Sequence, residues 1–419
     1  MKIYVHFLGQ TTVIAMRVLV IDEEVPFPLN SGKRLRTFNL LKHLASRHEI
    51  TFVCRYHDGV DEFDPQQLEA AGIRTVVVPH PVLKKAGLRF YFTLLANVLS
   101  RYPYVATSHH SAQLIDVIKS LVEKDGFDLI HCEWTPYAIN VKPFLPAPSV
   151  VVAHNVESMI WRRNFEIEKN PLKKAYIYLQ YKKMEQFERE AFSLFTRVVA
   201  VSDQDKALID QWAPEDQSTV VPNGVDIDYF RSSGLSQKPH SVVFTGSLDW
   251  RPNVDCMLYF LDEIWPLVLQ TFPNASFTIV GRRPTRQLQD RMKNEHSVKL
   301  TGTVDDVRPY IEKASVYIVP LRIGGGSRLK ILEALSMRKA VVSTSIGAEG
   351  LTVIPDRELL IADEPEDFAK AIAGLFQDPA LCDRLGSSGH KLVEKHYQWK
   401  ALANKLEEVW LQALDMGKT

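Results

Sequence analysis

The chain has 419 residues, enough for about two or three domains, and its 46% hydrophobic and 24% charged residues are typical of a globular protein. Lys and Arg (50) balance Asp and Glu (50), so the overall charge does not indicate a nucleic-acid partner. The cysteines are spaced too widely for a zinc ribbon and predict buried free thiols in a reducing compartment: Cys54, Cys132, Cys256 and Cys382.

Residues 1–15 precede the first predicted strand, and two interpretations of them stay open. One is a short signal peptide, although His6, Gly9 and Gln10 interrupt its apolar region. The other is an extension before the folded start. No apolar run approaches the about 20 residues that a membrane-spanning helix needs.

From residue 17 onward, short β-branched runs alternate with helical patterns, which predicts parallel α/β sheets. In the first half we expect strands near 17–21, 50–54, 74–78, 128–131, 149–153 and 197–201, with helices near 33–46, 109–123, 171–193 and 203–212. In the second half we expect strands near 242–245, 276–280, 298–301, 315–319 and 340–343, with helices near 254–270, 306–313, 328–337, 365–377 and 380–394.

The turn-rich segment 221–225 and the polar segment 231–240 separate these two sets of βα units. A last helix, about 400–416, carries one apolar face formed by Leu402, Leu406, Val409, Trp410 and Ala413. That face is expected to pack either on its own domain or back on the first one.

Doubly wound sheets bind ligands at the carboxyl ends of their strands. Glycine-containing loops follow the predicted strands 17–21, 242–245, 276–280 and 298–301, contributing Gly32, Gly246, Gly281 and Gly302. Turn geometry alone explains any one of these glycines. Their agreement on one edge indicates anion-binding loops.

The most informative segment is Val319–Ala334, where a strand runs into three glycines, a serine, two cations and a helix. Arg328 and Lys330 predict a phosphate or diphosphate ligand, and Glu333 shares a helix face with Lys330. Both cations reach one anion only if the helix starts near Ser327 or Arg328. A solvated helix start with a Lys330–Glu333 surface pair is the alternative.

Taken in order, these segments resemble the retaining glycosyltransferases of family 4, which have the GT-B fold, and most closely their bacterial polysaccharide-building members. The matching segments are 26–36, 127–131, 152–157, 199–202, 221–226, 244–247, 252–253, 279–281, 301–302 and 320–334. The resemblance implies two Rossmann-like doubly wound α/β domains that face each other across a cleft. Residues 1–222, completed by a C-terminal helix at about 396–419, would bind the acceptor, and residues 223–395 the nucleotide sugar.

The same resemblance implies transfer of a sugar from a UDP- or GDP-linked donor to a glycan or lipid-linked acceptor in cytoplasmic steps of cell-surface polysaccharide synthesis. It implies no cofactor and no metal, and the chain shows no Asp-x-Asp pair at a strand end. By position, the catalytic group would comprise His154, Arg328 and Lys330. The donor-binding group would comprise Gly32, Gly246, Ser247, Gly281, Arg282, Gly325, Gly326, Ser327 and Glu333, and the acceptor-binding group Arg34 and Glu157.

Two of these positions have a second interpretation, and one departs from the family. His154 is also explained as a structural histidine after a strand, and Glu157 as a residue favoured by the dipole at a helix start. Many family members carry another glutamate eight positions before Glu333, where this chain has Gly325. The hydroxyl contact of that glutamate is then missing or comes from a backbone N–H of the glycine loop.

Two other functions share this fold. A nucleotide-sugar 2-epimerase needs several acids and bases around the sugar, and the 328–333 segment does not resemble that family. A non-catalytic sugar-nucleotide-binding partner in a polysaccharide assembly complex is suggested by Gly325.

Two basic and aromatic stretches, Lys84–Arg101 and Arg162–Lys183, suggest peripheral attachment to anionic lipid on the inner face of the cytoplasmic membrane. A core-packing helix with a solvated basic face is the other interpretation of each stretch.

Overall fold

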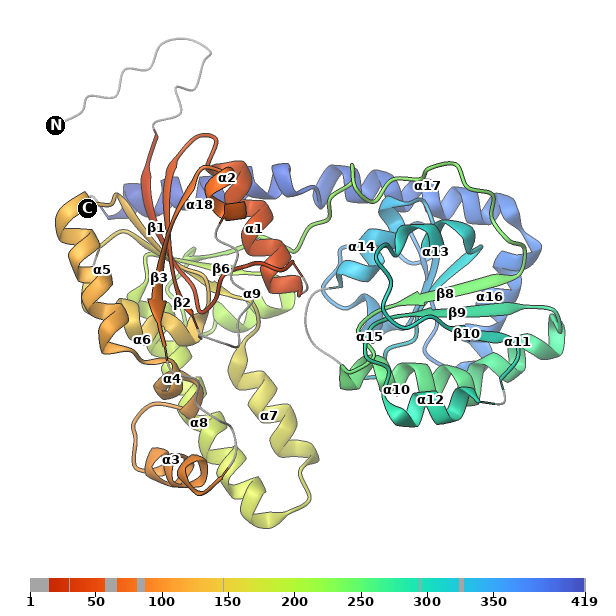
Figure 1. Cartoon of the computed structure of the whole chain (residues 1–419), viewed down its shortest axis with the longest axis horizontal. Coiled ribbons are helices and arrows are strands. Elements are labelled where there is room, and N and C mark those ends of the chain that lie inside the picture. The colour runs from red at the N-terminus through yellow and green to blue at the C-terminus, as the bar shows by residue number, and fades with distance from the viewer. Residues whose placement is uncertain are drawn as a thin grey trace, which may run out of the picture. The chain divides into compact units, whose positions relative to one another are not determined.

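The computed structural model describes residues 15–29, 31–56, 66–80, 87–145, 147–293, 295–323 and 328–417 (Figure 1). The chain divides into two compact units. Unit 1 comprises Met1–Ala200, Asp205–Thr219 and Ala403–Thr419, and unit 2 comprises Val201–Gln204 and Val220–Leu402.

Unit 1 is built on a seven-stranded sheet in the order β3-β2-β1-β4-β5-β6-β7. Its central strand β1 is apolar on both faces, because helices cover both sides of a parallel sheet. β1 pairs in parallel with β2 and β4, so that Val20 lies opposite Phe52 and His131. The strands are β1 Arg17–Ile21, β2 Glu49–Tyr56, β3 Ile73–Pro79, β4 Leu129–Cys132, β5 Ser149–Ala153, β6 Arg197–Ala200 and β7 Ser218–Val220.

Two helices of the first half begin at serine caps. Ser31 accepts a hydrogen bond from the Arg34 N–H, and Ser111 does the same for Leu114, so α1 and α5 start at these positions. The helices are α1 Gly32–Leu44, α2 Gln66–Ala70, α3 Leu88–Val98, α4 Tyr104–His109, α5 Ala112–Asp125, α6 Ala138–Val141, α7 Glu157–Ile167, α8 Pro171–Leu194 and α9 Asp203–Ile209, with 3-10 turns at Thr135–Tyr137 and Lys142–Phe144.

The structure adds α3 and α7, which the sequence patterns did not predict. The stretch Arg162–Lys183 is divided between two helices, because Asn170 caps a new helix whose first residue is Pro171. Figure 1 shows α7 and α8 as an antiparallel pair that extends from the body of unit 1, with α3 near their far end. Lys183 Nζ ties α3 to α8 by donating to the Asn97 carbonyl at 2.6 Å.

Helix α18 (Trp399–Met416) returns to unit 1, with which residues 403–419 are grouped. Leu402, Leu406, Val409, Trp410 and Ala413 are all buried, which confirms the predicted apolar face. The helix therefore contributes side chains to the interior of the unit built by the opposite end of the chain.

Unit 2 is built on a six-stranded sheet in the order β10-β9-β8-β11-β12-β13. β8 pairs in parallel with β9 and β11, which places Val243 opposite Thr278 and Tyr317. The strands are β8 Ser241–Thr245, β9 Ser276–Val280, β10 Val298–Leu300, β11 Val316–Val319, β12 Ala340–Ser343 and β13 Leu360–Ile361. The helices are α10 Arg251–Tyr259, α11 Trp265–Thr271, α12 Arg286–Met292, α13 Arg308–Lys313, α14 Leu329–Ser336, α15 Ser345–Ala348, α16 Pro365–Gln377 and α17 Pro379–His396.

The single helix predicted near 254–270 contains a π-helical segment, Phe260–Ile264, between α10 and α11. Pro266 stands at the start of α11, where it lacks an N–H and its ring would meet the carbonyl four residues earlier. A wider turn before the proline relieves that clash, and the chain continues as one bent helical run.

None of the four cysteines forms a disulfide bond. Cys54, Cys132 and Cys256 are buried, as predicted, whereas Cys382 is only partly buried. Within the described residues, no helix combines the length and the apolar character that crossing a bilayer requires.

Candidate active site

In unit 2, the ends of β8 and β9 meet through two glycines. Gly246 follows β8 and donates its N–H to the Val280 carbonyl at 3.0 Å. A Cβ added to Gly281, which follows β9, would lie 1.9 Å from the Gly246 carbonyl oxygen and 2.8 Å from Leu248 Cγ. Because no side chain fits at position 281, the two strand ends are in direct backbone contact, and neither glycine adds a side chain to this edge.

Lys330 of α14 lies against this edge. Its Nζ donates to Asn253 Oδ1 at 2.8 Å and would be 3.0 Å from a Cβ on Gly246. Asn253 Nδ2 in turn donates to the Ser247 carbonyl at 2.9 Å, and Arg282 Nε donates to Ser247 Oγ at 3.0 Å. The structure therefore brings together four of the predicted residues, Gly246, Ser247, Arg282 and Lys330, through Asn253.

The two charged groups on α14 both have perturbed pKa values. Burial lowers the pKa of Lys330 to about 8, since few solvent dipoles are left to stabilise the ammonium. Burial raises the pKa of Glu333, one turn further along α14, to about 7, although the nearby Lys330 charge opposes this shift. An anionic ligand beside Lys330 would raise its pKa again and favour the charged form.

The other predicted cation of this segment has a different partner. Arg328 forms the N-cap of α14, and its Nε and Nη2 donate to the carbonyl (3.2 Å) and carboxylate (3.1 Å) of Glu349. Its side chain is only 7% exposed. In the described part of the chain, Arg328 and Lys330 therefore have different hydrogen-bond partners, although the Arg328 charge contributes to lowering the pKa of Lys330. The predicted residues Gly325, Gly326 and Ser327 lie outside the described residues.

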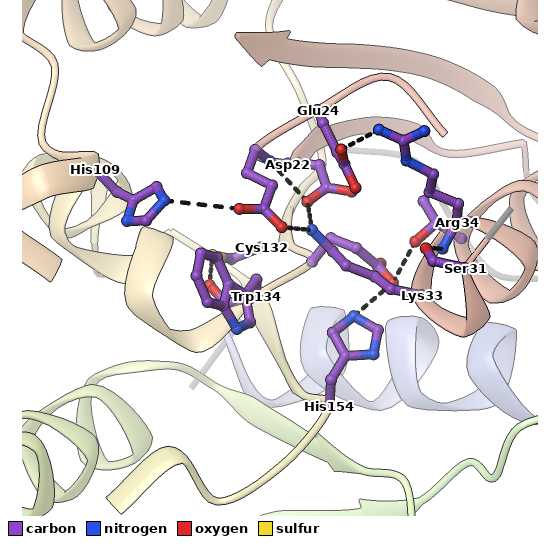
Figure 2. Close-up of polar contacts among 12 residues, drawn as sticks. Asp22, Glu24, Ser31, Lys33, Arg34, His109, Cys132, Trp134 and His154 are labelled. Atoms are coloured by element: carbon purple, nitrogen blue, oxygen red, sulfur yellow. Dashed lines mark hydrogen bonds and ion pairs between the residues drawn. The ribbon is translucent and has the colours of Figure 1, made fainter. Parts of the chain in front are cut away.

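In unit 1, a buried charged cluster lies where β1, β4 and β5 end (Figure 2). Lys33 Nζ contacts Asp22 Oδ1 at 2.6 Å and Glu23 Oε1 at 2.7 Å, and lies 5.4 Å from the centroid of the Trp134 ring. Burial raises the pKa of Asp22 to about 7, and the negative charge of Glu133 adds to this effect while Lys33 opposes it. Burial alone would lower the pKa of Lys33, but its two carboxylate partners raise it.

His154 follows β5 and is directed to this cluster. Its Nε2 lies 3.4 Å from Glu133 Oε1, and its side chain is 11% exposed. Burial lowers the pKa of His154, with smaller contributions of the same sign from Arg36 and Lys33, while Glu133 opposes the shift. Since the ordinary pKa is 6.5, the imidazole is neutral at pH 7.

The remaining predicted residues of unit 1 surround the same cluster. Gly32 is the first residue of α1. Arg34 forms an ion pair with Glu24 and donates to the Pro28 carbonyl at 3.3 Å. Glu157, the first residue of α7, accepts a hydrogen bond from Trp134 Nε1 at 3.0 Å, and burial raises its pKa.

Several residues of these two sites received no role from the sequence, although Lys33 and Asn253 lie in segments that match the family. They are Asp22, Lys33, Glu133 and Trp134 in unit 1 and Asn253 in unit 2. Two of them carried a usable signal, because Asp22 and Glu133 are acidic residues directly after apolar strands. Throughout the described ranges, no group of three His, Cys, Asp or Glu side chains is arranged to hold a metal ion.

Comparison with known proteins matches both halves of the chain to family models. Residues 32–229 match "Glycosyltransferase Family 4", and residues 239–378 match "Glycosyl transferases group 1". The chain is 22% identical over 402 residues to an "Uncharacterized 44.6 kDa protein in cps region" of Klebsiella pneumoniae, a match covering 93% of this chain and 98% of that protein.

Solved glycosyltransferase structures share the fold. Sucrose-phosphate synthase from Thermosynechococcus elongatus superposes with a TM-score of 0.68 at 18% identity, covering 95% of this chain and 98% of that chain. HepE from Anabaena, in complex with UDP and glucose, superposes with a TM-score of 0.62 at 15% identity, covering 94% of this chain and 98% of that chain. The two parallel sheets of this chain are thus the pair of Rossmann-like units that make up the GT-B fold, as the sequence predicted.

Proposed function

Because this chain belongs to glycosyltransferase family 4, we propose that it transfers a sugar, with retention of configuration, from a nucleotide diphosphosugar to a glycan or lipid-linked acceptor. The pathway we propose is cell-surface polysaccharide synthesis, which is supported by the relative from a cps region. A UDP- or GDP-linked sugar is the proposed donor, and HepE, which was crystallised with UDP-glucose, supports the first of these.

The observation that carries this proposal is the buried ammonium of Lys330 beside the side-chain-free edge formed by Gly246 and Gly281. Breaking the bond between sugar and phosphate leaves growing negative charge on the diphosphate. A cation already fixed beside the diphosphate stabilises the transition state more than the ground state, because the negative charge on the diphosphate is larger in the transition state. The lowered pKa of Lys330 is consistent with an ammonium that has no ion-pair partner among the described residues and would gain one when the diphosphate binds.

The other predicted residues receive roles in the same scheme. Glu333, one turn along α14, would accept hydrogen bonds from the ribose hydroxyls, and Arg282 and Ser247 would line the nucleotide. Arg328, whose Nε and Nη2 donate to Glu349, would contribute positive charge beside the diphosphate.

In unit 1, His154 would accept a hydrogen bond from a hydroxyl of the reacting sugar, while Arg34 and Glu157 would orient the acceptor. No glutamate nucleophile is assigned. The proposed retaining step is a front-face displacement in which the leaving phosphate takes the proton of the acceptor hydroxyl.

A thermal-shift series with nucleoside diphosphates and their sugars tests donor binding, because a ligand raises the apparent stability of the state it binds. We expect one nucleotide to raise Tm and the matching nucleotide sugar to release free nucleotide slowly without acceptor. Lys330→Met should abolish that release while the protein stays folded. Lys339→Met is the matched control: Lys339 is also buried, but it caps the carbonyls of Glu312 and Ala314. Absence of any nucleotide effect, or unchanged release in Lys330→Met, would contradict the proposal.

We also propose that unit 1 binds anionic membrane through a basic-apolar surface on α3, α7 and α8, where a lipid-linked acceptor would be presented. Large apolar side chains are exposed there, including Leu99 (92%), Leu172 (84%) and Phe92 (67%). Basic residues lie on α7, α8 and the linker between them: Arg162, Arg163, Lys169, Lys173, Lys174 and Lys182. The Lys84 and Lys85 of the predicted stretch lie outside the described residues.

A further inference from the structure

We infer that a chain of hydrogen bonds from Trp410 through His131 and Glu133 fixes the orientation and tautomer of His154, leaving its Nδ1 as an acceptor for a substrate hydroxyl. Glu133 and His131 are thus positioning residues for the proposed transfer, on which this inference rests.

The direction of the chain is set at Trp410, on the C-terminal helix α18. Trp410 Nε1 donates to His131 Nδ1 at 3.1 Å, and an indole N–H can only donate. His131 Nδ1 must therefore carry a lone pair, so its single proton is on Nε2. His131 is fully buried in β4, where no water can replace the indole.

The next link is Glu133, two residues later and also buried. His131 Nε2 lies 2.7 Å from Glu133 Oε2, and Thr37 Oγ1 of α1 donates to Oε1 at 3.0 Å. Burial alone would raise the pKa of Glu133, but its contacts with His131 and His154 hold it well below the usual range. The carboxylate is therefore ionised and accepts hydrogen bonds only.

His154 completes the chain. Its Nε2 is buried and lies 3.4 Å from Glu133 Oε1, too poorly aligned for a hydrogen bond, and it has no hydrogen-bond partner among the described residues. Facing an obligate acceptor, Nε2 presents its proton and Nδ1 keeps its lone pair. The long contact is typical of sites without substrate and can shorten when a ligand closes over it.

A second chain in unit 1 repeats this arrangement away from His154 and supplies a control. The Met16 N–H donates to His48 Nδ1 at 3.3 Å, and His48 Nε2 lies 2.7 Å from Glu407 Oε1 on the same helix α18. Glu407→Gln thus disturbs a buried His–Glu pair of the same kind that shares no hydrogen bond with the first chain, although the His48 ring lies 5.8 Å from the Trp410 ring.

The test uses full-length protein labelled with ¹⁵N-histidine, whose ring-nitrogen shifts report proton positions directly. The His154 signals are those that disappear in His154→Asn. In the wild type we expect the Nε2–H tautomer to be the neutral form of His154 between pH 7 and 8, with the Nδ1–H form below detection. Glu133→Gln should yield a mixture of both forms, and Trp410→Phe should shift the His131 signals. Glu407→Gln should change neither histidine.

The kinetic readout is the pH dependence of transfer. Glu133→Gln should lower the plateau rate by about 10²-fold, the usual size of a misplaced acid–base or hydrogen-bonding group. The substitution should also move the acidic limb of the pH–rate profile to lower pH. The Glu133 carboxylate, which favours the His154 imidazolium, is gone, while the Arg36 and Lys33 charges that disfavour it remain. A loss of stability alone would lower the rate without moving that limb.

A wild-type His154 with its proton on Nδ1, or charged at pH 7, would overturn the inference, as would a Glu133→Gln variant with unchanged rate and pH profile. Unchanged His131 signals in Trp410→Phe would remove Trp410 from the chain. If no donor is used at all, the proposed function fails, yet the spectra still decide the tautomer of His154.

Discussion

At the scale of single residues, Lys330 and Lys339 show how position decides what a buried lysine does. Burial lowers the pKa of both to about 8. Lys339 uses its protons to cap two backbone carbonyls, and this is a structural role. Lys330 has the amide of Asn253 as its hydrogen-bond partner and lies beside a glycine edge, so it can exchange that partner for a phosphate.

This difference predicts a pH effect on nucleotide affinity. A lysine with a pKa of about 8 is mostly charged at pH 7 and loses its proton as the pH rises through 8. The diphosphate binds the charged form, and the second ionisation of its terminal phosphate, near pH 6, is already complete. We therefore expect affinity for the nucleoside diphosphate, measured by calorimetry, to fall about tenfold per pH unit above pH 8.

The two lysines give matched variants for this measurement. Lys330→Met should bind the nucleoside diphosphate more weakly at pH 7, and its affinity should not change with pH above pH 8. Lys339→Met should keep the wild-type profile even though two carbonyls lose their donor, at a cost of about 1–3 kcal/mol in stability. A sloping profile in Lys330→Met would assign the titration to another group.

At the scale of elements, the contact between the ends of β8 and β9 depends on Gly281. A Cβ added at position 281 would lie 1.9 Å from the Gly246 carbonyl oxygen, and a backbone atom at a strand end cannot move aside as a flexible side chain can. Gly281→Ala should therefore separate the two strand ends, lower the stability of unit 2 by more than about 2 kcal/mol and abolish nucleotide binding.

Gly374, in helix α16, is the matched comparison. An added Cβ there meets nothing within 4 Å. Gly374→Ala should raise stability by about 1 kcal/mol, because alanine loses less backbone entropy in a helix, and should leave nucleotide binding unchanged. Denaturant unfolding of both variants with and without nucleotide provides the measurement. Equal effects of the two substitutions would refute the role given to the strand-end contact.

At the scale of the whole molecule, the proposed membrane surface joins three helices that no local pattern groups together. Figure 1 shows α3, α7 and α8 at one end of unit 1. Basic side chains near anionic lipid contribute about 1 kcal/mol each, and exposed apolar groups add burial. We expect co-sedimentation with vesicles that contain an anionic phospholipid, little with zwitterionic vesicles, and weaker binding at high salt.

The variant for this test replaces two exposed leucines of this surface, Leu95→Glu with Leu99→Glu, and should reduce vesicle binding by about tenfold or more. Leu411→Glu, at a 43% exposed position on α18, is the control and should bind as the wild type does. If the wild type bound negligibly to both anionic and zwitterionic vesicles, the proposed membrane surface would be wrong and these helices would have a structural role alone.

What the sequence determined by itself was local. Alternating β-branched runs predicted most strands, and the amphipathic pattern predicted α18, because backbone propensity and side-chain period act over a few residues. The glycines at strand ends could be placed for the same reason, since every parallel strand ends at one edge of its sheet. Several helices were missed, most of them short; the longest of these are α3 and α7, and in α3 large apolar side chains face outward.

The tertiary structure alone decided which side chains meet. Lys330 finds Asn253, 77 residues away, and Arg328 finds Glu349, 21 residues away, although the two cations are neighbours in the sequence. His131 meets Trp410 across 279 residues, and Thr37 meets Glu133 across 96. These pairs follow from strand order and from the return of α18 to unit 1, which are set by the burial of whole apolar faces. No short stretch of sequence contains both partners, so local propensity could not predict them.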